Sequence, residues 1–326
     1  MKQLLNTLFL FLIGMSFPFS GLIAQNGTSI IKTVVIDAGH GGKDPGCRGH
    51  HTHEKHMTLK LALQFGGMIE AGFPDIDVIY TRTTDVFLPL DERADIANKK
   101  NADLFISIHC NAHNSSVSGT ETFVMGLHKA KENLAVAKRE NSSIYLEEDY
   151  EVKYQGFDPE SDEGHIWLTM VQNMYLTQSI SLANKIEAQF EEVANRKSRG
   201  VKQAGFVVLR LTTMPSVLIE AGFLSNRTEE AFINSDNGQY QMAKAMFNAF
   251  SEYKYEMDQI AAPELDVQVA PKKRSEPQAE VAIVPPVQKT KPPKNTSAKS
   301  VVPEATQTTT TSAGQDVWMA EPLTRP

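Results

Sequence analysis

Residues 34–40 have the sequence VVIDAGH, a short β-branched run that ends in a histidine after a glycine. Two later stretches have a similar form: LFISIH at residues 104–109 and VLIE at residues 217–220. Such runs are typical of strands buried on both faces of a sheet. Ligands of α/β proteins bind beyond the carboxyl ends of the strands. The pattern therefore predicts an α/β domain whose chemistry lies where these strands end.

The segments between about residues 33 and 255 alternate between strand-like and helix-like patterns. Further strands are expected at residues 77–81, 121–125 and 206–209. Helices are expected at residues 59–69, which Gly72 and Pro74 follow, from Leu90 with Asp91 as N-cap, and at residues 240–250. These elements predict a single catalytic domain at residues 30–258, with ample length for one core.

Two regions depart from this alternation. The connection from residue 130 to residue 190 is unusually long and includes an acidic, turn-rich patch at residues 147–164. Residues 130–163 are therefore a candidate regulatory insertion, or else an ordinary surface excursion. Residues 261–326 carry 10 of the 16 prolines together with many Lys, Thr and Ser, which predicts a disordered tail.

The first 24 residues have the composition of a secretory signal peptide. Lys2 precedes an apolar stretch, and small residues lie near Ala24. A membrane anchor is the alternative, but Pro18 and the short apolar run disfavour a span. The mature protein is expected to be exported, periplasmic and without a stable membrane span. The net charge of −7 gives no reason to expect nucleic-acid binding.

The chain has two cysteines, Cys47 and Cys110, too few for a disulfide-built scaffold. Each lies near a candidate metal ligand in the sequence. A bridge between them and two unpaired thiols are both compatible with the sequence, because the sequence does not give their separation.

The residues that end the buried runs are suited to metal chemistry. His40 lies between glycines, which let the backbone approach a ligand closely, and His109 ends the second run. Two imidazoles, a carboxylate and an open position form a catalytic zinc site, and a further carboxylate serves as a base. Glu220 ends the third run. The alternatives are hydrogen-bonded core histidines and a structural carboxylate.

The third ligand is ambiguous from chemistry alone. The segment HHTHEKH, residues 50–56, offers Glu54 but also His53 and His56, and histidine is the commonest metal ligand. A solvated His-rich loop is a further reading of the same residues.

Several motifs, in order, resemble the zinc-dependent N-acetylmuramoyl-L-alanine amidases of the type 3 family. They are DAGHGG (residues 37–42), TR (81–82), ER (92–93), SIHCNA (107–112), GTETF (119–123), Val207 with LR (209–210) and MPSVLIEAGFLSN (214–226). The match spans about residues 32–255. Cys110 and Ala221 depart mildly from the family pattern, without removing a reacting group.

The resemblance implies a central six-stranded, mostly parallel sheet flanked by helices. It also implies one zinc ion per chain, with His40, Glu54 and His109 as ligands, because the family has a Glu-Lys pair at the place of Glu54 and Lys55. Glu220 carries over as the catalytic glutamate. The implied reaction is hydrolysis of the amide between N-acetylmuramic acid and L-alanine in peptidoglycan, in wall turnover or septum splitting during cell division.

Regulation is also implied by the resemblance. In the branch of the family that acts in division, an inserted helical segment covers the active site until an activator protein displaces it. Residues 130–163 occupy that interval, with Glu147 and Glu148 as candidates for the inhibitory carboxylate. Two other functions stay open: a zinc peptidase that cuts within the stem peptide, and a catalytically silent wall-binding protein.

Overall fold

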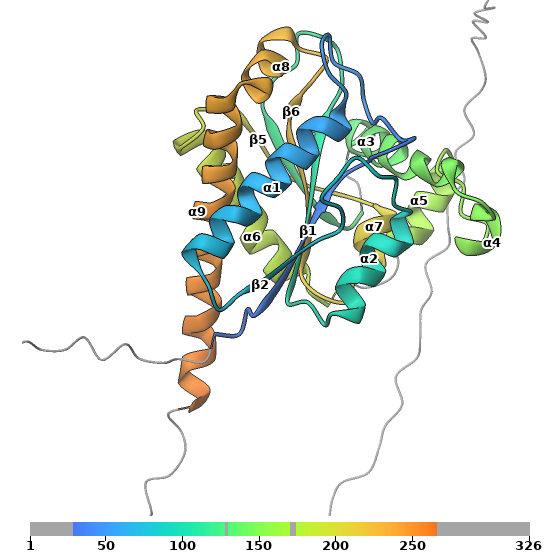
Figure 1. Ribbon diagram of the computed structural model, residues 1–326. Coiled ribbons are helices and arrows are strands. Elements are labelled where there is room, and N and C mark those ends of the chain that lie inside the picture. The colour runs from blue at the N-terminus through green and yellow to red at the C-terminus, as the bar shows by residue number, and fades with distance from the viewer. Residues whose placement is uncertain (1–28, 128–129, 170–173, 266–326) are drawn as a thin grey trace, which may run out of the picture. The chain divides into compact units, whose positions relative to one another are not determined.

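The computed structural model describes residues 29–127, 130–169 and 174–265 (Figure 1). Its centre is a six-stranded sheet with the strand order β2-β1-β3-β6-β4-β5. The strands are β1 (Thr33–Ala38), β2 (Asp77–Tyr80), β3 (Leu104–Asn111), β4 (Thr120–Met125), β5 (Ser198–Ala204) and β6 (Ser216–Phe223). Neighbouring strands are parallel except β4 and β6, which are antiparallel. The predicted mostly parallel six-stranded sheet is confirmed.

Helices connect the strands and cover the sheet. They are α1 (Glu54–Gly72), α2 (Leu90–Lys99), α3 (Lys131–Asn141), the 3-10 helix η1 (Ser142–Leu146), α4 (Tyr150–Lys153), α5 (Asp162–Thr169), α6 (Leu176–Glu192), α7 (Val207–Arg210), α8 (Arg227–Asn234) and α9 (Asp236–Leu265).

The two faces of the sheet are covered by different helices, as Figure 1 shows. One face packs Ile36, Ile106 and Ile219 against α1, α6 and α9. The other packs Val35, Phe105 and Leu218 among apolar residues of α2, α7 and the segment from α3 to Phe157. Because side chains alternate along a strand, His109 and Glu220 lie on this second face with Phe105 and Leu218.

Two strand assignments near the end of the domain differ from expectation. Residues 206–209 were predicted as a strand, which is wrong, because Val207–Arg210 is the short helix α7. Apolar runs of this length do not distinguish a strand from a buried helical turn. The sixth strand is instead β5, Ser198–Ala204, an edge strand with half-exposed polar residues and therefore no apolar run.

The helix boundaries differ slightly from expectation. Pro89 is the N-cap of α2, so Asp91 lies in its first turn rather than at the cap. Helix α9 continues to Leu265, past the expected domain end at residue 258. The expected signal peptide and residues 266–326 of the expected tail lie outside the described residues. Among the helices that the structure describes, none has the length and apolar character needed to cross a membrane.

Candidate metal centre and active site

His40 follows β1 in a left-handed backbone conformation, with φ of 60°. Buried arginines hold this turn through its carbonyl groups. Arg93 donates to the carbonyl oxygens of Ala38 at 2.8 Å and His40 at 2.7 Å, and to the carboxylate of Asp37 at 2.8 Å. Arg82 donates to the carbonyl oxygens of Ala38 and Gly39. The left-handed backbone conformation of His40 costs energy in isolation. It is stabilised here by hydrogen bonds that the two charged guanidinium groups donate to the carbonyl oxygens of the turn.

The His40 ring is oriented by a carboxylate. Its Nδ1 atom lies 2.8 Å from Oδ2 of Asp44, four residues further along the chain. This contact leaves Nε2 directed at the centre of the site. A carboxylate on the outer nitrogen is the usual support for a metal-binding histidine.

Glu54 is the first residue of α1 and is fully buried. Its Oε1 atom lies 3.1 Å from Nε2 of His40 and 3.1 Å from Nδ1 of His109. Backbone N–H groups of Cys47 and Cys110 also donate to its carboxylate, each at 2.8 Å. The structure thus brings the three predicted ligands together.

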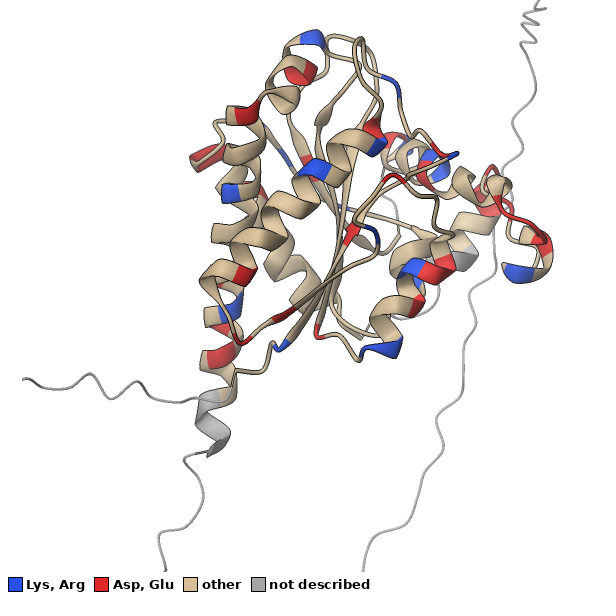
Figure 2. Ribbon diagram, viewed as in Figure 1, with Lys and Arg blue, Asp and Glu red and all other residues tan. Residues whose placement is uncertain are grey.

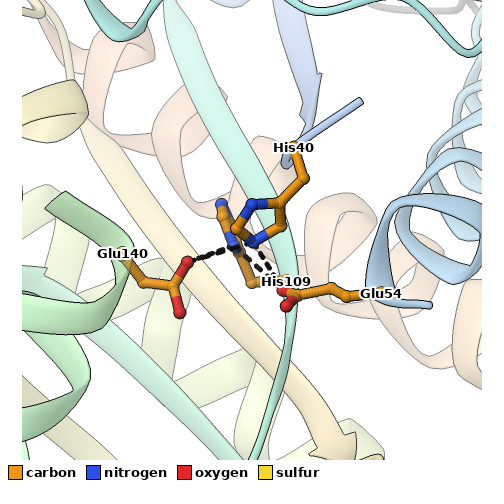
Figure 3. A group of neighbouring side chains, drawn as sticks. All are labelled: His40, Glu54, His109 and Glu140. Atoms are coloured by element: carbon orange, nitrogen blue, oxygen red, sulfur yellow. Dashed lines mark hydrogen bonds and ion pairs between the residues drawn. The ribbon is translucent and has the colours of Figure 1, made fainter. Parts of the chain in front are cut away.

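A fourth group completes the cluster. Glu140, near the end of α3, places Oε2 3.2 Å from Nε2 of His40 and 2.9 Å from Nδ1 of His109 (Figure 3). All four residues are buried, and their ligand atoms lie within 4.8 Å of one another. Figure 3 shows the two imidazoles between the carboxylates of Glu54 and Glu140.

The spacing of these atoms suits a metal ion. Ligands about 2.1 Å from a tetrahedral zinc ion lie about 3.4 Å from one another. Nε2 of His40 and Oε2 of Glu140 are buried and make no hydrogen bond within the described residues, although they lie 3.2 Å apart. Two imidazoles with carboxylates are a donor set that zinc accepts. The residues present therefore fit a zinc ion.

Glu220 lies next to this cluster, on the strand adjacent to His109. The two residues are in register between β3 and β6, and Glu220 is fully buried. Its Oε1 accepts a hydrogen bond from Nη2 of Arg139 at 3.2 Å, whereas Oε2 has no partner in the described part of the chain. Burial and the nearby Glu140 carboxylate raise the pKa of Glu220 well above its ordinary value, although Arg139 opposes them. A carboxyl group in such surroundings is suited to carrying a proton.

The other candidate ligands lie outside the cluster. His53 is the N-cap residue of α1 and faces His56, with ring centroids 6.5 Å apart, and neither belongs to the group of ligand atoms. Cys47 and Cys110 are free thiols, and Sγ of Cys47 lies 3.1 Å from the carbonyl oxygen of Cys110. Of the two alternatives that the sequence left open, the structure shows the unpaired thiols.

Neither candidate for the inhibitory carboxylate, Glu147 or Glu148, belongs to the cluster. Glu147 accepts hydrogen bonds from the backbone of Leu90, from Lys153 and from Tyr154. The bond from Leu90 joins the end of η1 to the start of α2. Glu148 is exposed. The carboxylate in the cluster is Glu140, which sequence reasoning missed because nothing in its spacing sets it apart from the other acids of residues 130–163.

Comparison with known proteins places the chain in a family. Residues 34–252 match the family model described as N-acetylmuramoyl-L-alanine amidase. The chain is 31% identical over 249 residues to the amidase AmiA of Salmonella typhimurium, covering 73% of this chain and 84% of that protein. It is also 31% identical over 231 residues to AmiA of Escherichia coli K12, covering 70% of this chain and 78% of that protein.

Solved structures agree. The catalytic domain of the amidase CwlV from Paenibacillus polymyxa superposes with a TM-score of 0.51 at 30% identity, covering 68% of this chain and 98% of that one. An amidase from Clostridium difficile 630 gives a TM-score of 0.51 at 26% identity, covering 73% and 99%. The chain therefore belongs to the N-acetylmuramoyl-L-alanine amidase family.

Proposed function

We propose that this amidase holds one zinc ion through His40, Glu54 and His109 and hydrolyses the amide between N-acetylmuramic acid and L-alanine in peptidoglycan. The convergence of four buried ligand atoms beside a buried glutamate carries the proposal. Family membership supports the choice of bond. The zinc peptidase and the silent wall-binding protein are disfavoured, because the relatives are named as amidases and the reacting groups are present.

When bound, zinc supplies Lewis-acid activation of a water molecule and of the scissile carbonyl. The chain supplies the remaining steps. Glu220 takes a proton from the attacking water and delivers it to the departing amine of L-alanine. Asp44 keeps Nε2 of His40 directed at the centre, and the backbone N–H groups of Cys47 and Cys110 orient Glu54.

The described conformation is an inhibited one in this proposal. A catalytic zinc site uses three protein ligands and keeps the fourth position for water or substrate. Glu140 fills the fourth position in the cluster, and its neighbour Arg139 contacts the carboxylate of Glu220 at 3.2 Å. Helix α3 must therefore move before substrate enters.

The segment that carries α3 is also suited to a partner. Figure 2 shows acidic residues along the segment from η1 to α5, and exposed apolar side chains accompany them: Tyr145, Leu146, Val152 and Ile166. The CwlD amidase of Clostridioides difficile, at 26% identity and a TM-score of 0.50, was solved in complex with the GerS lipoprotein. We propose that an activator protein binds this chain. We also propose that this chain is exported to the periplasm and acts there in wall turnover or septum splitting.

Metal content and reaction products test the proposed function. Purified protein should contain one zinc per chain, and digestion of peptidoglycan should release intact stem peptides with a free amino group on L-alanine. Cuts within the stem peptide, or hydrolysis that survives exhaustive chelation, would contradict the proposal.

A further inference from the structure

A row of side chains extends across the sheet from the cluster of His40, Glu54, His109 and Glu140. His109 on β3 is in register with Glu220 on β6, and Glu220 is directly opposite Glu121 on β4. Residues opposite one another on neighbouring strands direct their side chains to the same face. The row therefore runs from a proposed zinc ligand, through the proposed catalytic glutamate, to Glu121.

Two cations on the edge strand β5 end this row. Oε1 of Glu121 lies 2.5 Å from Nε of Arg199 and 2.6 Å from Nζ of Lys202. The register of β4 and β5 shifts between Thr120 and Thr122, and Gly200 on β5 has φ of 83°. This irregularity places Arg199 and Lys202, three residues apart, on the same side of the sheet as Glu121.

The two cations share one ion-pair partner. Glu121 is the only carboxylate in the described part of the chain that forms an ion pair with either of them. The side chain of Arg199 is 33% exposed and that of Lys202 is 19% exposed. Arg199 donates through Nε, and its two terminal nitrogens make no hydrogen bond among the described residues. A guanidinium with free terminal nitrogens binds a carboxylate in a bidentate manner.

The proposed reaction implies that the peptide part of the substrate lies along this row of side chains. Glu220 protonates the departing amine, so the amide nitrogen lies beside Glu220 and the peptide continues away from the metal. Neighbouring strands are about 4.8 Å apart, which places β5 about 10 Å from β6. Two residues of extended peptide span about 7 Å, and the long side chain of Arg199 covers the remainder.

We propose that Arg199 and Lys202 form a subsite for a carboxylate on the residue that follows L-alanine in the stem peptide. This inference rests on the proposed function and names a specificity determinant of the same site. The second residue of a stem peptide is a glutamate joined through its side chain, so its α-carboxyl group is either free or amidated. The subsite favours the free carboxylate.

A purely structural role is the competing explanation. If the two cations only neutralise Glu121, their removal affects every substrate alike. If they bind substrate, their removal affects only the substrate that carries the carboxylate. A comparison of two substrates by one enzyme separates these cases.

The experiment is a competition between two defined glycan tetrasaccharides in one tube. Their peptides are L-Ala-γ-D-Glu-L-Lys and the same tripeptide with an α-carboxamide on the second residue. Mass spectrometry of the released peptides gives the ratio of the two kcat/KM values. This ratio does not depend on the fraction of enzyme molecules that are open. The full chain is used, both as wild type and with Glu140→Ala.

The wild type should release the carboxylate peptide about tenfold faster, as a charge-assisted contact allows. Arg199→Gln combined with Lys202→Gln should bring the ratio of the two kcat/KM values to within about twofold of unity, whatever change the two rates share. Lys60→Gln, an exposed control on α1, should keep the preference. The preference should also fall as salt is raised.

Equal release of both peptides by the wild type would overturn the inference without any variant. So would a double variant that slows both peptides alike. Failure of the proposed function has a different signature, because then neither glycan releases a peptide with a free amino group on L-alanine.

Discussion

Nη2 of Arg139 lies 3.2 Å from Oε1 of Glu220, while the same guanidinium contacts the carboxylate of Glu140 at 2.9 Å. Arg139 and Glu140 are consecutive residues of α3. One helix therefore contacts the metal cluster and the proposed catalytic glutamate together. A single displacement of α3 would therefore free both groups.

Glu140→Ala in the full chain should raise the basal rate of amide hydrolysis by about tenfold or more, because it removes the fourth ligand. Zinc should stay bound through the other three residues. Release of L-alanine-terminated peptides, measured with metal content, checks this. Glu132→Ala, an exposed change on the same helix, is the matched control. An unchanged or lower rate in a folded Glu140→Ala protein would contradict autoinhibition.

This substitution is a sharper test than deletion of residues 134–163. That segment contributes Val136, Ala137, Ile144, Tyr154 and Phe157 to the core on the second face of the sheet. Their removal would expose apolar surface and destabilise the domain, which would mask any gain in activity.

Glu220→Gln should lower kcat by about 10²- to 10⁴-fold, the usual contribution of a general acid–base group. The amide cannot accept the proton of water, yet it has nearly the same shape. Zinc content and thermal stability should stay close to those of the wild type. Hydrolysis at a wild-type rate would show that another group moves the proton.

Glu54→Gln should weaken zinc binding by at least about a hundredfold, because a charged ligand is lost from the cluster. His53→Ala and His56→Ala should leave the affinity within about threefold of the wild type, since neither ring belongs to the cluster. Competition with a chromophoric chelator measures all three variants. A large loss in either histidine variant would support alternative ligation.

Glu187 gives a prediction about stability and pH. This buried carboxyl accepts hydrogen bonds from Thr120, Thr122 and Ser198, and burial raises its pKa above the ordinary value of 4.5. A raised pKa in the folded state means that the unfolding free energy falls as pH rises from about 4.5 through the folded value.

Glu187→Gln removes this titration. The unfolding free energy of the variant minus that of the wild type should therefore increase as the pH is raised from 4 to 8. Urea unfolding of both proteins at each pH measures the difference. Glu191→Gln, on the same helix α6, controls for the loss of one negative charge. A difference that does not change with pH would refute the assignment.

Much of the fold was predictable because buried parallel strands have a strong sequence pattern. The runs that form β1, β3 and β6 are continuous, apolar and β-branched. They could therefore be identified as buried strands, and the polar residues at their ends as candidates for the site. Strand β5 was missed because an edge strand needs no such run. Helix α7 was assigned as a strand because four apolar residues have no resolvable period.

The site was predictable to the extent that it depends on strand ends. His40, His109 and Glu220 each end a buried run, so their position followed from the fold. Glu54 required the family resemblance, because His53 and His56 are equally suitable by residue type. Glu140 depends on how α3 packs over the sheet, and packing of an inserted helix is not encoded in a short motif.

The backbone turn at residues 38–40 is held by Arg82 and Arg93 through hydrogen bonds that involve no metal. These hydrogen bonds, which form on folding, therefore offset the energetic cost of the left-handed turn, and metal binding is not needed for it. The pocket is preorganised, unlike that of a zinc finger, whose chain folds only around its ion. In the proposed zinc site, the chain would complete its fold before the ion arrives and take it up afterwards without rearranging His40.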